Sequence, residues 1–106
     1  MMTEARASRL RADLRGRIAS IADARSRLNA RELVEGVDAI RSLAHAHGFS
    51  AVSCIAARLE SALARDTSGA TLLCYLDALD DAVKLEPMHL PAQQALLASV
   101  ALRLGR

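Results

Sequence analysis

The amino-acid sequence predicts an all-α protein: an antiparallel up-and-down four-helix bundle with an additional C-terminal helix, five helices in all. Hydrophobic residues make up 52 % of the chain, but with one Phe, one Tyr and no Trp the core must consist of Leu, Ile, Val and Ala. Ala and Leu have high helix propensities, and no stretch shows the period-two alternation of a strand. Short connections between the apolar stripes favour antiparallel neighbours. We expect residues 1–106 to form one domain, because this length supports a single core.

The first helix is expected from about residue 4 to residue 27, with Thr3 as its N-cap. Apolar side chains recur every three or four residues, as on the buried stripe of an amphipathic helix. These inward positions are Leu10, Leu14, Ile18, Ile21 and Leu28. The other faces carry Arg6, Arg9, Arg11, Arg15, Arg17, Arg25 and Arg27 against Asp13 and Asp23.

A basic helix of this kind is typical of proteins that bind nucleic acid or an acidic lipid surface. However, no aromatic side chain is interleaved for base stacking, and the net charge of the chain is only +2. We therefore interpret the arginines as a solvated face. A nucleic-acid-binding module and a plain dimerisation bundle stay as further alternatives.

The next two apolar patterns predict a helical hairpin. Asn29 can cap a helix over residues 30–47, and Gly48 can end it in the left-handed conformation. Ser50 is expected to cap the third helix, residues 51–65. The inward positions are Leu33, Val37, Ile40, Ala44 and His47 in the first of these helices, and Val52, Ile55, Leu59 and Leu63 in the second.

A turn is expected at Asp66-Thr67-Ser68-Gly69, followed by a fourth helix over residues 70–85. Pro87 should end that helix, and Pro91 should open the last one, residues 92–104. The expected inward positions are Leu72 or Leu73, Leu76, Leu79, Val83, Leu96, Leu97, Val100 and Leu104. Asp77, Asp80 and Asp81 are expected to point outward, as a solvated acidic face rather than a cation site.

No apolar run approaches the roughly 18 residues that span a bilayer, and the N-terminus lacks the apolar segment of a secretory signal. Cys54 and Cys74 lie in apolar helical surroundings, which favours two buried thiols over a disulfide. We expect a cytoplasmic protein that does not insert into a membrane. The initiating Met and the polar end at Gly105-Arg106 suit a complete small protein.

The stretch VDAIRSLAHAHGFSAVSCIAARLE, residues 37–60, resembles the core of the histidine phosphotransfer (HPt) domain family. That family carries H-x-L-K-G-x-A on one helix, then a G-F or G-A corner, then a helix ending in A-x-x-L-E. An ungapped alignment on Leu59-Glu60 places Gly48-Phe49 at the corner. It also matches Ile40 to the family leucine, Arg41 to the lysine, Ser42 to the small residue, and Ala44 and Ala56 to the alanines. The resemblance extends over roughly residues 4–86.

The departure from the family is Asp38, which occupies the position of the phosphorylated histidine. In the family, an exposed imidazole nitrogen attacks the acyl phosphate of a response regulator. A carboxylate repels a phosphoryl group and has no such nitrogen. The resemblance therefore implies an HPt-like protein, not an enzyme and without a cofactor, that carries no phosphate. Its implied partner is a response-regulator receiver domain or a histidine kinase, bound through Asp38, Arg41, Ser42 and His45.

An active phosphorelay protein phosphorylated on His45 is the alternative. His45 lies seven residues after Asp38, about 10 Å further along the same helix face. It lacks a basic residue three positions on and a glycine four positions on, so it departs from the family motif. The simpler interpretation is an exposed imidazole near a helix C-terminus, where partial positive charge is favourable.

Other chemistry has little support in the sequence. His45 and His47 are two residues apart and face different directions on a helix, so they do not form a metal-binding pair. We expect His47 at the edge of the core and His89 in solvent. The chain has no glycine-rich phosphate loop and no nucleophile elbow. We expect no metal and no small-molecule substrate.

Overall fold

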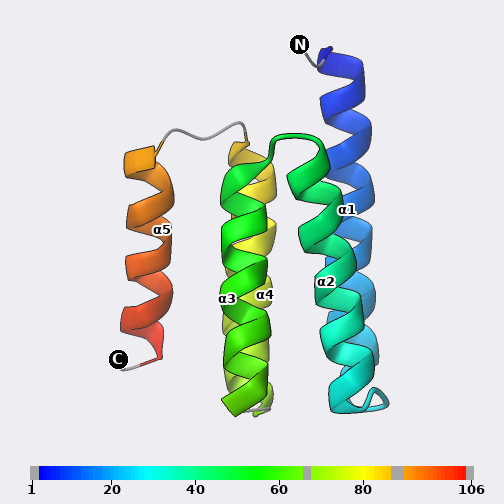
Figure 1. Ribbon diagram of the computed structural model, residues 1–106, viewed down its shortest axis with the longest axis vertical. Helices are drawn as coiled ribbons and strands as arrows, with labels where there is room; N and C mark the ends of the chain where they lie inside the picture. Colours follow the sequence, from blue (N-terminus) through cyan, green and yellow to red (C-terminus); the bar gives the residue numbers. More distant parts are fainter. Residues whose placement is uncertain (1–2, 66–67, 87–89, 105–106) are drawn as a thin grey trace.

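The computed structural model describes residues 3–65, 68–86 and 90–104, with residues 90–96 described only as helix. The described residues form five α-helices: α1 (Glu4–Ala24), α2 (Ala30–Ala46), α3 (Ser50–Arg65), α4 (Gly69–Leu85) and α5 (Leu90–Arg103). Helices α1 to α4 alternate in direction and pack as a bundle, and α5 packs along α4 at the edge (Figure 1). The predicted all-α fold class with five helices is confirmed.

Three helix ends follow from local sequence. The Thr3 hydroxyl accepts a hydrogen bond from the Arg6 N–H at 3.2 Å, as predicted. Asn29 and Glu32 bond reciprocally at 2.8 and 3.2 Å and form a capping box at the start of α2. Gly48 has a φ of +78°, the left-handed conformation predicted for the end of α2. Such caps stabilise a helix by about 1 kcal/mol each.

The start of α3 differs from the prediction. Ser50 is the first helical residue rather than the cap. The N–H groups of Ala51 and Val52 donate to the carboxylate of Glu86, at 2.7 and 3.2 Å. Glu86 follows the last residue of α4, and only 3 % of its surface is exposed. A negative charge at a helix N-terminus is favourable, so a residue distant in sequence caps α3.

Two other helix boundaries shift by two residues or more. Helix α1 ends at Ala24 instead of residue 27, because the Arg27 N–H bonds to the Ala24 carbonyl at 2.8 Å in a tight turn. Helix α5 begins at Leu90, two residues before the expected start. Ser68, placed in a turn by the sequence, caps α4 by accepting from the Thr71 N–H. The predictions for Asp66, Thr67, Pro87 and His89, and those for the side chains of Pro91 and Leu96, lie outside the described residues.

The predicted inward stripes form the core. Leu72 rather than Leu73 is fully buried, and Leu28, Leu97 and Leu104 are partly buried against the core. Val100 anchors α5, with 2 % of its surface exposed. The largest fully buried side chains are Leu14, Val37, Ile40, Val52, Ile55, Leu59, Leu79, Val83 and Val100.

The inward or outward predictions were wrong at three residues. His47 is exposed, because α2 ends one residue before it and His47 is the C-cap. Asp80 and Asp81 are partly buried rather than fully outward, whereas Asp77 is exposed as predicted. Asp80 joins α1 to α4 through an ion pair with Arg15 at 2.9 Å. Cys54 and Cys74 are free thiols, and both are only partly buried. None of the described helices combines the length and apolar character needed to span a membrane.

Candidate partner-binding face

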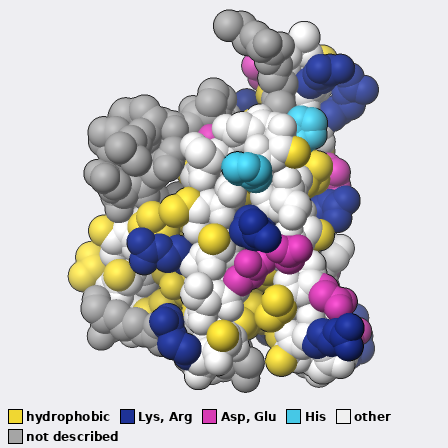
Figure 2. Space-filling model, viewed as in Figure 1, with side chains coloured by type: hydrophobic (Ala, Val, Ile, Leu, Met, Phe, Trp, Pro, Cys, Tyr) yellow, Lys and Arg dark blue, Asp and Glu magenta, His cyan; other side chains and the backbone are white. Residues whose placement is uncertain are grey.

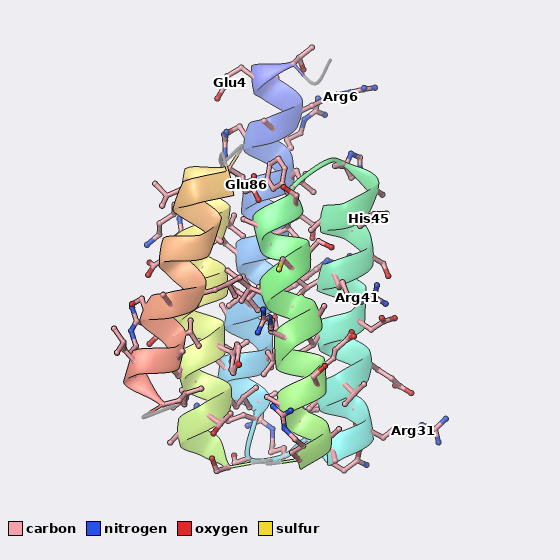
Figure 3. All side chains as sticks on the ribbon, turned by 60° about the vertical axis from the view of Figure 1, so that its left-hand side comes forward. Glu4, Arg6, Arg31, Arg41, His45 and Glu86 are labelled. Carbon is pink, nitrogen blue, oxygen red and sulfur yellow. The ribbon has the colours of Figure 1, made fainter. Side chains whose placement is uncertain are left out.

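The four residues predicted to bind a partner lie along one side of α2. We call Asp38, Arg41, Ser42 and His45 the α2 face. Ser42 and His45 are exposed, and Asp38 and Arg41 are partly buried. Figure 2 shows histidine, basic and acidic side chains following one another down the middle of this view, and Figure 3 shows Arg41 and His45 on α2.

The opposite side of the same turns is anchored in the core. Val37, Ile40 and Ala44 each have 0 % of their surface exposed. Residues three and four apart share a helix face, so burial of this stripe orients the α2 face toward solvent. The rigid placement of the four polar residues therefore follows from the apolar period of α2.

Arg41 is the centre of a three-residue charge cluster. Its Nη2 donates to the Asp38 carboxylate on α2. Its Nε lies 3.2 Å from one carboxylate oxygen of Glu60 on α3 and 3.3 Å from the other. The guanidinium thus bridges the two helices of the hairpin. With two carboxylates and one guanidinium, the cluster has a net negative charge.

The two carboxylates respond to Arg41 differently. The hydrogen bond from Arg41, aided by its charge, holds the pKa of Asp38 below the ordinary value of 3.8. Burial raises the pKa of Glu60 above its ordinary value of 4.5, and this outweighs the hydrogen bond and charge of Arg41. The main difference is solvent access, since 49 % of the Asp38 side chain but only 22 % of the Glu60 side chain is exposed. The neighbouring Asp38 also raises the pKa of Glu60.

Sequence reasoning did not identify Glu60 as a partner of Arg41. It placed Glu60 only at the end of the aligned motif. A signal was present, because Arg41 lies seven residues before Gly48 and Glu60 ten residues after Ser50. Both are therefore about two to three helical turns from the corner of the hairpin, where antiparallel neighbours of opposite charge can meet.

His45 lies in the last turn of α2, where its side chain is exposed. Within the described residues, neither Ser42 nor His45 makes a side-chain hydrogen bond or ion pair. The same part of the chain contains no group of three or more His, Cys, Asp or Glu side chains placed to hold a metal ion. The α2 face therefore offers a paired charge cluster at Arg41 and unpaired polar groups at Ser42 and His45.

Comparisons with protein-family models, with curated proteins and with solved structures found no match for this chain. The resemblance of residues 37–60 to the HPt motif thus stays a prediction, and so does partner binding at the α2 face.

Proposed function

We propose that this protein is an HPt-like binding module of two-component signalling, which binds a receiver domain or a histidine kinase through the α2 face and carries no phosphate itself. The observation that supports this most is the position of Asp38. The resemblance aligns Asp38 with the phosphohistidine of the family. Asp38 lies on a solvent-facing stripe of a helical hairpin, and its carboxylate accepts a hydrogen bond from Arg41.

The charge cluster argues against phosphate transfer at this position. A phosphoryl group approaching Asp38 would meet the carboxylates of Asp38 and Glu60, with only Arg41 between them. Like charges in such proximity repel. A carboxylate that is ionised and already bonded to a guanidinium is also a poor nucleophile.

The same cluster leaves part of the Arg41 guanidinium available to a partner. A guanidinium has five N–H groups, and the bonds to Asp38 and Glu60 use Nε and Nη2. Nη1 can donate to a carboxylate of a partner without displacing either neighbour. Ser42 is small and exposed, so it lets a partner approach the helix closely.

The test combines phosphate transfer and binding. The parent chain is incubated with a panel of phosphorylated receiver domains and histidine kinases, and both acid-labile phosphate and affinity are measured. We expect no phosphate on the chain and binding to at least one partner. Arg41→Ala should weaken this binding about tenfold, while Arg31→Ala, an exposed arginine on the same helix that pairs with Glu35, should not.

Phosphate on the parent that disappears in His45→Ala would replace this proposal with the phosphorelay alternative. Equal affinities of the Arg41→Ala and Arg31→Ala variants would show that the α2 face is not the contact surface. Absence of binding to every receiver and kinase would refute the proposed class of partner.

A further inference from the structure

A second polar surface lies on the other side of α2, where its last turn meets the first turns of α1. An open groove there is lined by Arg6, Arg9, Leu10, Asp13, Leu43 and His47. The first turns of α1 extend beyond the ends of the neighbouring helices (Figure 1). Arg6 and Arg9 line the groove together with Leu43 and His47 at the end of α2. We call these six residues the basic groove.

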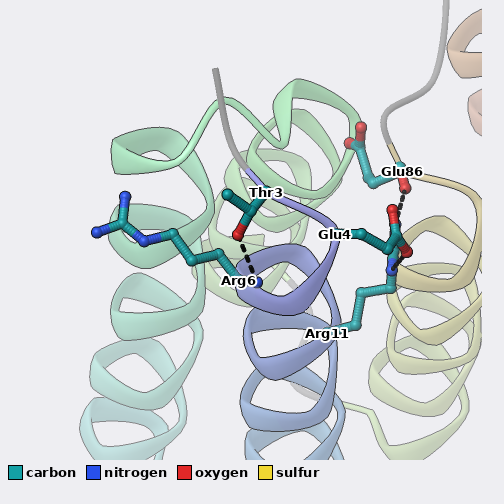
Figure 4. A network of polar contacts seen from close by, with 5 residues as sticks. All are labelled: Thr3, Glu4, Arg6, Arg11 and Glu86. Carbon is teal, nitrogen blue, oxygen red and sulfur yellow. Dashed lines mark hydrogen bonds and ion pairs between the residues drawn. The ribbon is translucent and has the colours of Figure 1, made fainter.

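The positive charge of the basic groove is not compensated within the described part of the chain. No described carboxylate forms an ion pair with Arg6 or Arg9, although both side chains are exposed. Asp13, the acid on the groove wall, pairs with Arg17 at 3.0 Å. Glu4 pairs with Arg11 at 3.4 Å, and Figure 4 shows this pair on the opposite side of α1 from the Arg6 side chain.

The position of Arg6 is unfavourable for folding alone. It lies in the first turn of α1, three residues after the cap Thr3. The N-terminus of a helix carries partial positive charge, so a cation there opposes the helix dipole. Arg6 therefore opposes the dipole of its own helix and has no partner among the described carboxylates, which leaves its charge available to an anionic ligand.

The apolar side chains at the bottom of the groove indicate which class of ligand fits it. Leu10 is buried and Leu43 is partly buried, so the two make an apolar floor beside the cationic walls. Such a surface fits an aliphatic side chain flanked by carboxylates. It suits nucleic acid poorly, because no aromatic side chain lines the groove for base stacking and the Asp13 carboxylate stands on its wall. A recessed floor also does not insert into a lipid surface.

We propose that the basic groove binds an acidic segment of a partner protein, with one large aliphatic residue among its carboxylates. Arg6 and Arg9 bind the carboxylates, Leu10 and Leu43 receive the aliphatic side chain, and His47 offers a further N–H donor. This inference does not depend on the proposed receiver function. The α2 face borders α3 through Arg41 and Glu60, whereas the basic groove lies between α2 and α1.

The test uses the full chain labelled with nitrogen-15 and a short synthetic peptide with the core Glu-Asp-Leu-Glu-Asp. Two control peptides replace the Leu by Ser, or all carboxylates by amides. Binding is followed by chemical-shift changes and by calorimetry. The double variant Arg6→Gln, Arg9→Gln should lose about tenfold in affinity. The matched double variant Arg27→Gln, Arg58→Gln removes the same charge from exposed positions elsewhere and should retain the affinity of the parent.

Circular dichroism of both double variants checks that the helical fold is retained. The shifts should centre on residues of the basic groove, and both control peptides should bind more weakly than the parent peptide. Equal affinity losses in the two double variants, or equal binding of the amide peptide, would overturn the proposal. So would tighter binding of single-stranded DNA or of phosphatidylglycerol vesicles that depends on Arg6 and Arg9.

Discussion

Helix α2 has two electrically different sides. Toward α3, Arg41 is bonded to two carboxylates, and the cluster is net negative. Toward α1, Arg6 and Arg9 have no described acidic partner, and the basic groove is net positive. The overall charge of +2 hides this separation. The net charge of the whole chain does not distinguish these two surfaces, but the local ion pairs do. Arg41 already has acidic partners, whereas Arg6 and Arg9 can still attract an anionic group.

The largest effect is expected at Glu86, because this residue joins α3 to α1. Its carboxylate caps α3, and its backbone carbonyl accepts from Arg11 of α1 at 3.0 Å. Glu86→Ala leaves two buried N–H groups without their acceptor, so we expect a loss of about 2–3 kcal/mol in the free energy of unfolding. Urea denaturation measures this loss. Glu86→Gln retains an oxygen acceptor and should lose less; an equally stable Glu86→Ala variant would contradict the role of the cap.

The α2 face can be altered by removing its fixed negative charge. In the proposed receiver complex, Asp38 stands in place of a phosphohistidine and partly imitates its charge. We expect Asp38→Asn to change the affinity for the bound receiver about tenfold, measured by calorimetry. Asn and Asp have nearly the same shape, so an unchanged affinity would show that the charge of Asp38 does not contribute to binding.

The opposite pKa shifts of Asp38 and Glu60 predict opposite pH dependences of stability. Asp38 has a folded pKa below its ordinary 3.8, so its stabilisation is present above that pH and is lost as the pH falls through the folded value. Glu60 has a folded pKa above 4.5, so ionising it weakens the fold as the pH rises through the folded value.

Chemical denaturation of the parent, Asp38→Asn and Glu60→Gln at about pH 3 and about pH 7 compares the two groups. The stability of the parent relative to Asp38→Asn should be greater at the higher pH. The stability of the parent relative to Glu60→Gln should be greater at the lower pH. Parallel trends in the two variants would contradict the opposite directions of the Asp38 and Glu60 pKa shifts.

The smallest effects are expected at two glycines that line the space between α1 and α2. A Cβ on Gly16 would have no neighbour within 4 Å, so Gly16→Ala should stabilise α1 by about 0.5–1 kcal/mol. A Cβ on Gly36 would lie 3.1 Å from the end of the Ile21 side chain, so the same gain should be largely offset. Thermal unfolding distinguishes the two, and a greater gain at Gly36 would contradict this difference.

Local features of the fold could be predicted from the sequence. The caps at Thr3 and Asn29 and the left-handed Gly48 depend on a few neighbouring residues, and each was predicted correctly. The buried stripe of α2 followed from its period, because side chains three and four apart share a face. The same reasoning failed at His47. The apolar period of the sequence includes this position, but α2 ends at Ala46, so His47 is not on the buried stripe.

The contacts that were missed join distant parts of the chain. Glu86 caps a helix that begins 36 residues earlier, at Ser50, and Arg41 meets Glu60 across the hairpin. Sequence period predicts that a residue faces outward but not which side chain of another helix stands opposite. The shared position of Asp38, Arg41, Ser42 and His45 on one side of α2 could therefore be predicted, whereas the ion pair of Arg41 with Glu60 could not.

The cap at Glu86 also determines when the start of α3 can become fully hydrogen-bonded during synthesis. The hairpin of α2 and α3 is translated well before residue 86, so the first turn of α3 emerges without its acceptor. Only when α4 has been made and has packed in place does the carboxylate reach the N–H groups of Ala51 and Val52. A nascent chain that stops short of Glu86 should therefore contain every residue of the α2 face but have a frayed α3 start. The N-terminal cap of α3 therefore depends on the completed α4.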